Sequence, residues 1–430
     1  MLGRKLLSRP FASTKTLISP NRQFAQILSG YNNPGLLEKI LKIYNDKHLN
    51  LFSINGRVLE KDGRGMEKCQ FDISFDSNNK SAVKDVEGSL KNLQLDYQLQ
   101  SPPVVDWFPS KESDLDEIGS TLQSPGDGLN QDHPGFKDKE YKKRRNKIGD
   151  QTLNYKMGTP IPRIDYAPEE TALWGYIYNK VRPLHYKHGC KEYIKAMDDL
   201  ENTGLFKSTV IPQLEDLNAY LKQQTNWRIK PVNGILSQRE FLNCLAFRTF
   251  CSTQYIRHPS QPEYTPEPDI MHEFLGHIPN FLNHKMCDIS QRLGMLSLGA
   301  SDAQVAMIGA IYWFTVEFGL CREGEDIKFY GAGPGGSFGE IYHAEKIINN
   351  HRDKIYRLDI INNPVPTKFV VQDVQPFYYA ADSFDNFLQQ LEDYAAIYYK
   401  PFNLSYDHKN NSYESDRALY LRKPDEPILP

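Results

Sequence analysis

Residues 265–277, which read Thr-Pro-Glu-Pro-Asp-Ile-Met-His-Glu-Phe-Leu-Gly-His, constrain this chain more than any other stretch. The prolines stiffen its start, Asp269 is suited to cap a short helix, and Gly276 is suited to end it. His272 and His277 can bind one metal ion if the backbone aims both imidazoles at the same point. On an ideal α-helix five residues turn about 500°, which leaves the two side chains roughly 140° apart. We therefore expect His277 to swing back from just beyond the helix end and to form half of a metal site.

The spacing of the two histidines separates this stretch from a zinc peptidase. The peptidase pattern His-Glu-x-x-His places its second histidine four residues after the first, where this chain has Gly276. A zinc hydrolase is therefore an alternative that the sequence disfavours. The other alternative is structural, with His272 and His277 as two partly exposed side chains that flank a helix end.

A second segment supplies a carboxylate that would complete the site. Ser301 and Gln304 form a capping box, and the apolar run that follows them ends at Gly319. Because this run is apolar nearly all round, it predicts a buried helix with Glu317 in its last turn. Burial and the negative end of the helix dipole would both favour protonation of that carboxylate unless a cation compensates. Two histidines and one carboxylate form the facial triad of non-haem Fe(II), so we expect iron here.

Length, charge and cysteine usage bound the class of protein. The 430 residues suffice for two domains, and a net charge of −3 gives no reason to expect a nucleic-acid partner. The six cysteines are scattered without a Cys-x-x-Cys pair, which is typical of reduced thiols and argues against a disulfide framework or a zinc ribbon. The longest apolar segment, 303–320, contains Gln304 and Glu317, so we expect a soluble protein without a membrane span.

The beginning of the chain is basic and rich in hydroxyl groups. Before Glu38 it has no acidic residue, and its basic residues are Arg4, Lys5, Arg9, Lys15 and Arg22. This composition resembles a mitochondrial presequence, and it is equally typical of a disordered basic tail. A cytoplasmic and a mitochondrial location therefore both stay open, and we take 1–22 as a tail that precedes the first domain.

Residues 23–100 alternate short strands and helices. Four segments show strand patterns, at 23–28, 48–54, 69–75 and 94–99, and two show helical periodicity, at 34–44 and 81–93. This β-α-β-β-α-β order indicates an α+β ferredoxin-like sandwich. The layout resembles an ACT domain, a regulatory module that senses amino acids in metabolic enzymes. A purely structural or dimerising sandwich is the alternative.

The remainder divides into a linker, a large domain and a tail. Residues 101–128 are rich in Pro, Ser, Asp and Gly and form the predicted linker. Residues 129–410 show mainly helical periodicity, which predicts a mostly α catalytic domain with 368–374 as its main strand candidate. Residues 411–430 form a polar and charged tail without a heptad pattern.

Several motifs occur in one order and at consistent spacing between residues 105 and 410. They are 132–137, 211–216, 231–237, 255–258, 264–277, 312–319, 330–333 and 378–384. Together they resemble the pterin-dependent aromatic amino acid hydroxylases, in which a regulatory domain precedes a mostly α catalytic domain. The resemblance implies a monooxygenase that uses Fe(II), tetrahydrobiopterin and O2 on an aromatic amino acid.

The resemblance also implies roles for single residues. The Fe(II) ligands would be His272, His277 and Glu317, with Ser337 nearby orienting them. The residues expected to hold the pterin are Gly234, Leu236, Phe241 and Glu273, with the pterin ring stacked on Phe241. A structural interpretation exists for two of these, with Phe241 as a core aromatic and Glu273 as an exposed helix residue.

For the substrate, the resemblance implies that Arg257 binds the amino-acid carboxylate with its planar fork. The expected lining of the aromatic pocket is Thr265, Pro268, Trp313 and Gly333. The structural alternative for Arg257 is an ion pair with a carboxylate of the protein, and the alternative for Trp313 is a place in the core.

Two aromatic pairs bear on which amino acid is hydroxylated. Trp313-Phe314 is similar to the phenylalanine and tyrosine branches of the family, and Tyr378-Tyr379 is similar to the phenylalanine branch. We therefore expect conversion of phenylalanine to tyrosine, a step of phenylalanine catabolism, with tryptophan 5-hydroxylation and tyrosine 3-hydroxylation as alternatives. A non-catalytic amino-acid sensor is a distant alternative, because the triad and Arg257 are intact.

Two departures from the family pattern limit the resemblance. Pro334-Gly335-Gly336-Ser337 stands where the family usually shows Leu-Leu-Ser-Ser, which predicts a loop with more backbone freedom. The C-terminus lacks the apolar heptad helix that forms tetramers in animal members. We therefore expect a homo-oligomer, with a dimer favoured over a tetramer.

Overall fold

The computed structural model describes residues 23–61, 67–76, 80–93, 95–100, 103–118, 129, 131, 133–265, 267–371, 373–398, 400–416 and 419–422. The chain divides into two compact units. The smaller unit is Met1–Ser110, Pro401–Lys409 and Tyr413–Pro430, and the larger unit is Lys111–Lys400 and Asn410–Ser412. Several predicted segments lie wholly or partly outside the described residues. They include the tail 1–22, positions 101–102 and 119–128 of the linker, and positions 417–418 and 423–430 of the C-terminal tail.

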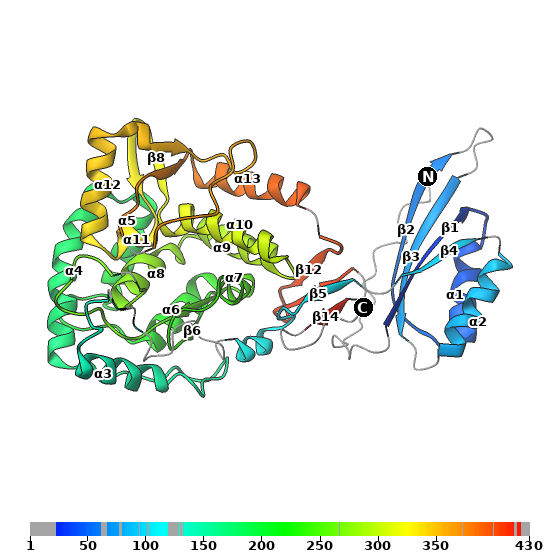
Figure 1. The fold of residues 1–430 in the computed structure, drawn as a ribbon, viewed down its shortest axis with the longest axis horizontal. Helices are drawn as coiled ribbons and strands as arrows, with labels where there is room; N and C mark the ends of the chain where they lie inside the picture. Colours follow the sequence, from blue (N-terminus) through cyan, green and yellow to red (C-terminus); the bar gives the residue numbers. More distant parts are fainter. Residues whose placement is uncertain are drawn as a thin grey trace. The chain divides into compact units, whose positions relative to one another are not determined.

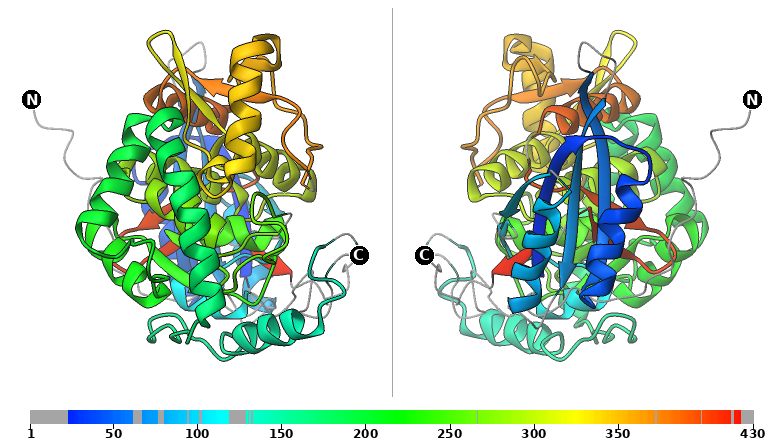
Figure 2. Two further views of the ribbon diagram at one scale, coloured as in Figure 1. Left: turned by 90° about the vertical axis from the view of Figure 1, so that its left-hand side faces the viewer. Right: turned by 90° about the vertical axis from the view of Figure 1, so that its right-hand side faces the viewer.

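The smaller unit has the β-α-β-β-α-β order that the sequence predicts. Its elements are β1 (Gln23–Tyr31), α1 (Leu36–Asp46), β2 (Asn50–Lys61), β3 (Glu67–Asp76), α2 (Lys80–Lys91) and β4 (Asp96–Gln100). The strands form an antiparallel sheet in the order β2-β3-β1-β4, and both helices cover one face of it (Figure 2). Phe71, Ile73 and Phe75 alternate along β3 and are buried, as the period-two pattern predicts. A role for this unit in sensing amino acids stays a prediction.

Two pairs of short strands lie outside this sheet, and the first of them joins segments that are far apart in the sequence. β5 (Val104–Asp106) pairs in parallel with β14 (Tyr420–Arg422), and β12 (Leu404–Asp407) pairs with β13 (Ser412–Ser415). Arg422 Nη2 donates to Asp106 Oδ1 at 2.6 Å across 316 positions of the chain. The last described residues therefore return to the strand that precedes the larger unit.

The larger unit is mostly helical, as expected (Figure 1). Its helices are α3 (Lys139–Asp150), α4 (Pro168–His188), α5 (Lys191–Asn202), α6 (Leu214–Thr225), α7 (Gln238–Ala246), α8 (Ile278–Asn280), α9 (His284–Ser297), α10 (Asp302–Tyr312), α11 (Ala332–Gly335), α12 (Phe338–Asn350) and α13 (Phe384–Ile397). One sheet has the order β10 (Ile355–Arg357), β11 (Tyr378–Ala381), β8 (Leu320–Glu323) and β9 (Asp326–Phe329), and β6 (Arg228–Pro231) pairs in parallel with β7 (Thr249–Ser252). Within the described parts of the chain, no helix has both the length and the apolar character needed to cross a membrane.

Helices α7, α9 and α10 pack together and support the site. The amide of Ser301 donates to Gln304 Oε1 at 2.9 Å, which confirms the predicted capping box at the start of α10. Gly294 of α9 lies against α7, because a Cβ at this position would be 2.1 Å from the amide nitrogen of Ala246. Only glycine allows this approach, so α9 and α7 meet at backbone contact.

The strand predicted at 368–374 is wrong, because the described residues of this segment form a loop. Side chains, and not a neighbouring strand, donate hydrogen bonds to the carbonyl groups of Val370, Val371 and Asp373. Gln375 Nε2 donates to the carbonyl of Val370, and the hydroxyl of Tyr264 donates to that of Val371, each at 2.8 Å. The β-branched valines favour an extended backbone, but tertiary hydrogen bonds decide the structure here.

Candidate active site

All the residues with a predicted functional role line one cavity of about 510 Å³ in the larger unit. The metal-site residues are His272, His277, Glu317 and Ser337, the pterin residues are Gly234, Leu236, Phe241 and Glu273, and the substrate residues are Arg257, Thr265, Pro268, Trp313 and Gly333. Small-molecule sites typically measure about 300–1,000 Å³, so the cavity is large enough to bind ligands. The fold therefore brings together every site residue that the sequence predicts.

His272 and His277 lie on a single π-helical turn, η2 (Met271–His277). The amide that follows this turn donates to the Glu273 carbonyl five residues back, so residues five apart stack on nearly one face. The expectation that His277 lies beyond a helix end is wrong, because the wider turn accommodates the extra residue. Gly276 does not end the helix either, since α8 continues directly from η2.

Glycines allow the backbone of α11 to pack directly against η2. A Cβ on Gly276 would lie 2.4 Å from the carbonyl oxygen of Ala332, and one on Gly336 would lie 2.5 Å from the Cα of His272. Contacts this short exclude a side chain at either position. The predicted gain of backbone freedom at 334–337 is therefore wrong. These residues are buried, and their glycines serve the close approach of α11 to the histidine turn.

Glu317 reaches the histidines from a second π-helical turn, η3 (Trp313–Glu317), which continues α10. Its carboxylate oxygens lie 3.3 Å from His272 Nε2 and 3.1 Å from His277 Nε2, and the two Nε2 atoms are 3.0 Å apart. An ion about 2.1 Å from ligands at right angles to one another holds these ligands about 3.0 Å apart. The three side chains therefore fit one face of an octahedral ion such as non-haem Fe(II).

The charges within the triad keep its carboxylate ionised. Burial acts to raise the pKa of Glu317, but the two imidazoles outweigh burial and hold this pKa well below its usual range. Burial acts to lower the pKa of His272, yet attraction to Glu317 raises it overall. The pKa of His277 is lowered, chiefly by burial. The neighbouring imidazoles therefore suffice to keep this partly buried carboxylate ionised, and an ionised carboxylate is the form that ligates a metal ion.

Arg257 is held by a carboxylate of the protein. Its Nε and Nη2 donate to the two oxygens of Asp269 at 2.9 and 2.8 Å, and both side chains are buried. Nη2 also donates to the Gly336 carbonyl at 3.0 Å, and Nη1 donates to that of Pro262 at 3.2 Å. Asp269 accepts the His272 amide at 3.2 Å, so the predicted cap is present. The ion pair was not expected for Asp269, and it fixes the guanidinium at the cavity wall.

Comparison with known proteins identifies the family. The family model for biopterin-dependent aromatic amino acid hydroxylases matches residues 106–418. The chain belongs to this family. Phenylalanine-4-hydroxylase of Mus musculus is 38% identical over 90% of this chain and 85% of the relative. Tryptophan 5-hydroxylase of Xenopus laevis is 35% identical over 92% of this chain and 84% of the relative. Tyrosine 3-monooxygenase of Mus musculus is 35% identical over 87% of this chain and 74% of the relative.

These identities place the hydroxylase in its family without separating the three substrate branches. The biopterin expected from the sequence is the cofactor that the family description names. The converging ligand atoms of His272, His277 and Glu317 fit the expected iron. The cofactor predictions are therefore confirmed, whereas the choice of amino acid needs an argument of its own.

The residues predicted to hold the pterin come from η2, from α7 and from the segment before α7. Phe241 lies edge-on to Tyr312, with ring centroids 5.1 Å apart, and lines the cavity. Glu273 is buried, and its Oε1 accepts the Thr253 amide at 3.1 Å. Burial raises the pKa of Glu273 to about 8. Glu273 is therefore not the exposed helix residue of the structural alternative.

An aromatic stack extends the wall on which Trp313 lies. Its ring stacks on Phe369 with centroids 4.4 Å apart, and its Nε1 donates to Gln375 Oε1 at 3.0 Å. Phe369 and Val371 also line the cavity, and neither was expected from the sequence. No spacing or periodicity could connect them with Trp313, since Gln375 alone is 62 positions away. Only the folded loop brings these groups together.

Ser337 and Thr265 hold the backbone at the edge of the cavity. Ser337 Oγ donates to the Glu263 carbonyl at 2.6 Å and caps α12 by accepting the Glu340 amide at 3.1 Å. Thr265 Oγ1 donates to the Glu267 carbonyl at 2.9 Å. These bonds shape the loops that flank the triad. The role of Ser337 in orienting the iron ligands stays a prediction.

Glu340 is a fully buried acid that was not singled out from the sequence. Its Oε1 accepts the Tyr378 hydroxyl at 2.6 Å, and burial raises the pKa of the carboxyl from 4.5 to about 7. Because the folded-state pKa exceeds the unfolded one, the stability that protonated Glu340 contributes is complete below pH 4.5. It is lost as pH rises through the folded pKa, and the loss amounts to about 3 kcal/mol.

Glu340→Gln should therefore abolish most of this loss, since an amide stays neutral and its oxygen can still accept the Tyr378 hydroxyl. Between about pH 5 and about pH 8 the free energy of unfolding should fall in the wild type, and it should fall much less in the variant. Urea unfolding over this range measures the difference. Glu345→Gln, which alters a partly exposed carboxyl on the same helix that pairs with Lys187, is the matched control and should show no such gain. Parallel pH profiles for Glu340→Gln and the wild type would contradict the prediction.

Proposed function

We propose that this hydroxylase converts L-phenylalanine to L-tyrosine, using O2 and tetrahydrobiopterin at an Fe(II) ion. The observation that carries the proposal is the convergence of the three triad ligands on a cavity that Arg257 and Trp313 also line. A metal, a pterin and an amino acid can therefore meet in one chamber. When bound, the iron and the reduced pterin supply the oxygen-activating chemistry that no side chain provides.

Arg257 would bind the carboxylate of the substrate. A guanidinium has five N–H donors, and the bonds to Asp269, Gly336 and Pro262 use four of them. One Nη1 donor is left for a ligand, and Asp269 holds the guanidinium group in a fixed orientation. The substrate ring would then lie against the stacked rings of Trp313 and Phe369.

The pterin would occupy the side of the cavity formed by α7 and η2. Phe241 offers a ring for stacking, and Glu273 can hydrogen-bond to the polar edge of the pterin. Gly234 and Leu236 would line the same side. These contacts position both reactants beside the metal and exclude water from the chamber, which is the protein's contribution to such a reaction.

The pair Tyr378-Tyr379, which resembles the phenylalanine branch of the family, favours phenylalanine over the other aromatic amino acids. Tyr379 of the branch-specific pair Tyr378-Tyr379 packs on Phe314, with centroids 5.3 Å apart. The two pairs that resemble the phenylalanine branch therefore contact each other, which gives them a physical route to influence the pocket behind Trp313.

Competition between the three amino acids tests the proposal. The purified chain is supplied with Fe(II), tetrahydrobiopterin, O2 and equal amounts of tyrosine, tryptophan and isotopically labelled phenylalanine. The label distinguishes tyrosine that is made from tyrosine that is supplied. We expect labelled tyrosine as the main product and the highest kcat/KM for phenylalanine. A higher kcat/KM for tryptophan or tyrosine would reassign the substrate.

A further inference from the structure

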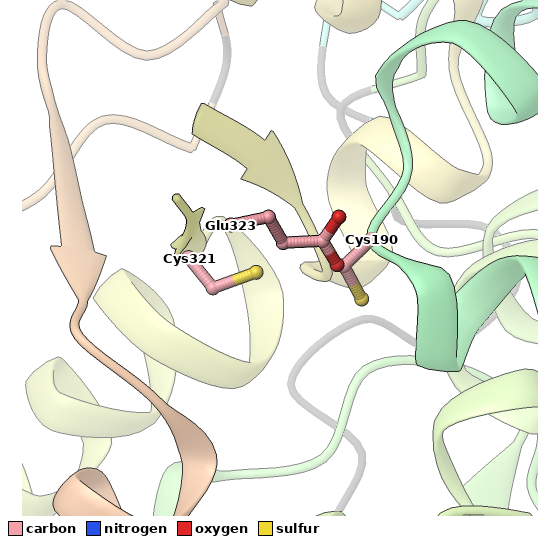
Figure 3. Close-up of side chains that lie close together, drawn as sticks. All are labelled: Cys190, Cys321 and Glu323. Carbon is pink, nitrogen blue, oxygen red and sulfur yellow. The ribbon is translucent and has the colours of Figure 1, made fainter. Parts of the chain in front are cut away.

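A second cluster of metal-ligating side chains lies outside the hydroxylase cavity. The Sγ atoms of Cys190 and Cys321 and a carboxylate oxygen of Glu323 all lie within 4.8 Å of one another. Figure 3 shows Cys321 and Glu323 extending toward Cys190. None of the three lines the cavity that contains the triad.

Hydrogen bonds of the backbone hold these side chains in place. Cys321 and Glu323 occupy alternate positions of β8, so their side chains point to the same face of the strand. The amide of Cys190 donates at 2.9 Å to the carbonyl of Phe329, which lies on the strand paired with β8. The amide of Lys191 donates to Glu323 Oε1 at 2.8 Å and orients the carboxylate. The cluster is therefore built by the start of α5 and by the β8–β9 hairpin.

The surroundings of the two sulfurs contain an unused hydrogen-bond donor. The hydroxyl of Tyr330 is buried and has no hydrogen-bond partner in the described part of the chain. The end of its side chain lies against Gly319, two residues before Cys321, and its pKa is raised by burial and by the charges that Cys321 and Cys190 can carry. A hydroxyl in this position can donate to a thiolate, and metal binding would create thiolates here.

We propose that Cys190, Cys321 and Glu323 form a second metal site, which takes a thiophilic divalent cation of the zinc class. Two thiolates and a carboxylate suit Zn²⁺, whereas the nitrogen and oxygen ligands of the triad suit iron. Zinc binds sulfur at about 2.3 Å, so two sulfurs on a tetrahedral ion lie about 3.8 Å apart. The ligand atoms need only small shifts to reach this geometry. Half-exposed Glu323 leaves one side open to water as a fourth ligand.

The bound ion would tie the start of α5 to the segment that carries the iron ligand Glu317. Cys321 follows Glu317 by four residues, and the Gly319 carbonyl between them accepts the amides of Tyr330 and Gly331, each at 3.1 Å. Binding would release both thiol protons to solvent and leave two thiolates on the ion. A cross-link of this kind holds the folded state together, so the ion should raise the thermal stability of the larger unit.

Cobalt binding to the full chain tests the site. The chain is loaded with iron, kept in a phosphine reductant and titrated with Co²⁺. Cobalt bound to thiolate absorbs in the near ultraviolet, and the triad contains no sulfur, so this absorption reports only on cysteine ligands. We expect one equivalent of Co²⁺ to produce the absorption and Zn²⁺ to abolish it by displacement. Absence of the absorption in the wild type would overturn the proposal of a second metal site. The proposed hydroxylase function would still stand, because it depends on the triad and not on this cluster.

Cysteine variants locate the signal within the chain. Cys321→Ser should lose the absorption, whereas Cys244→Ser should keep it. Cys244 is the matched control, because it forms the other close pair of buried thiols with Cys251. One equivalent of Zn²⁺ should raise the unfolding temperature of the wild type by a few degrees and leave that of Cys321→Ser unchanged. The same absorption or the same temperature shift in Cys321→Ser would show that the metal binds elsewhere.

Glu323→Gln provides a variant that leaves both sulfurs in place. Because Glu323 is only half-buried, the substitution should not prevent folding. The cobalt absorption should remain, but it should require a higher Co²⁺ concentration, since one charged ligand is lost. A Co²⁺ affinity equal to that of the wild type would remove the carboxylate from the site and contradict the proposal.

Discussion

Replacing His272 with alanine should remove the iron and stop hydroxylation together. The imidazole supplies one of the three ligand atoms, and its Nε2 lies 3.3 Å from the carboxylate of Glu317. Losing a group that only orients a metal ligand lowers metal affinity by about 10–100-fold, so losing the ligand itself should lower it by more than about 100-fold. Metal analysis after gel filtration should find iron in the wild type and almost none in His272→Ala. Tyrosine formation should fall below detection in the same preparation.

His188→Ala is the matched control for this experiment. Its imidazole is also partly buried, lies at the end of α4 and is 3.5 Å from Glu345, outside the cavity. This variant should keep its iron and its activity. Far-ultraviolet circular dichroism should be the same for both variants, which separates loss of the metal from loss of the fold. Wild-type iron content in His272→Ala would show that the triad is not the metal site.

The metal ligands can be predicted from the sequence, but the backbone that aims them cannot. Few side chains bind iron, so His272, His277 and Glu317 stand out by residue type. Their π-helical turns have no comparable signature, because a π-turn is rare and depends on packing. Gly276 shows why. It reads as a helix stop from its neighbours, whereas in the fold it lies against the carbonyl of Ala332.

Asp269 shows a second limit of sequence reasoning. An acid at the start of a helix predicts a cap, and the His272 amide does donate to this carboxylate. The same carboxylate also accepts three N–H groups of Arg257, twelve positions earlier: the backbone amide, Nε and Nη2. Both roles require only an aspartate, so residue type and spacing cannot reveal the second one. The structural alternative weighed for Arg257, an ion pair with a carboxylate of the protein, is therefore present in the fold.

In the smaller unit, the hydrophobic pattern does not predict the full length of one strand. The predicted strand 48–54 extends in the structure over β2 (Asn50–Lys61). Its additional residues include Val58 and Leu59, which are exposed. Alternation of apolar and polar residues marks only the part of a strand that packs against a core. Beyond that part, pairing with β3 extends the strand without a signal in the sequence.

Asp269→Asn should destabilise the larger unit strongly. The side chains of Arg257 and Asp269 are 2% and 1% exposed, so the substitution leaves a buried guanidinium without its counter-charge. Removing one partner of a buried ion pair costs about 3–5 kcal/mol, and we expect the free energy of unfolding to fall by that amount. Urea unfolding followed by tryptophan fluorescence measures the change, because Trp174 and Trp227 are fully buried in this unit.

Asp216→Asn is the matched control, because Asp216 also binds an arginine through two bonds. Arg163 Nη1 and Nη2 donate to its two oxygens at 3.0 and 2.5 Å, but these side chains are 59% and 42% exposed. Water and salt screen such a pair, so its loss should leave the unfolding midpoint almost unchanged. Equal shifts in the two variants would mean that burial does not set the strength of the Arg257 pair.

Asp269→Asn also separates a structural role of Arg257 from a role in binding the substrate. If the remaining Nη1 donor binds the amino-acid carboxylate, Asp269→Asn should raise KM for phenylalanine more than it lowers kcat, because the fork loses its orientation. Iron content, measured in the same preparation, should stay near the wild-type level, since all three ligands remain. An unchanged KM at full iron content would assign Arg257 and Asp269 to stability alone, and the carboxylate of the substrate would need another partner in the cavity.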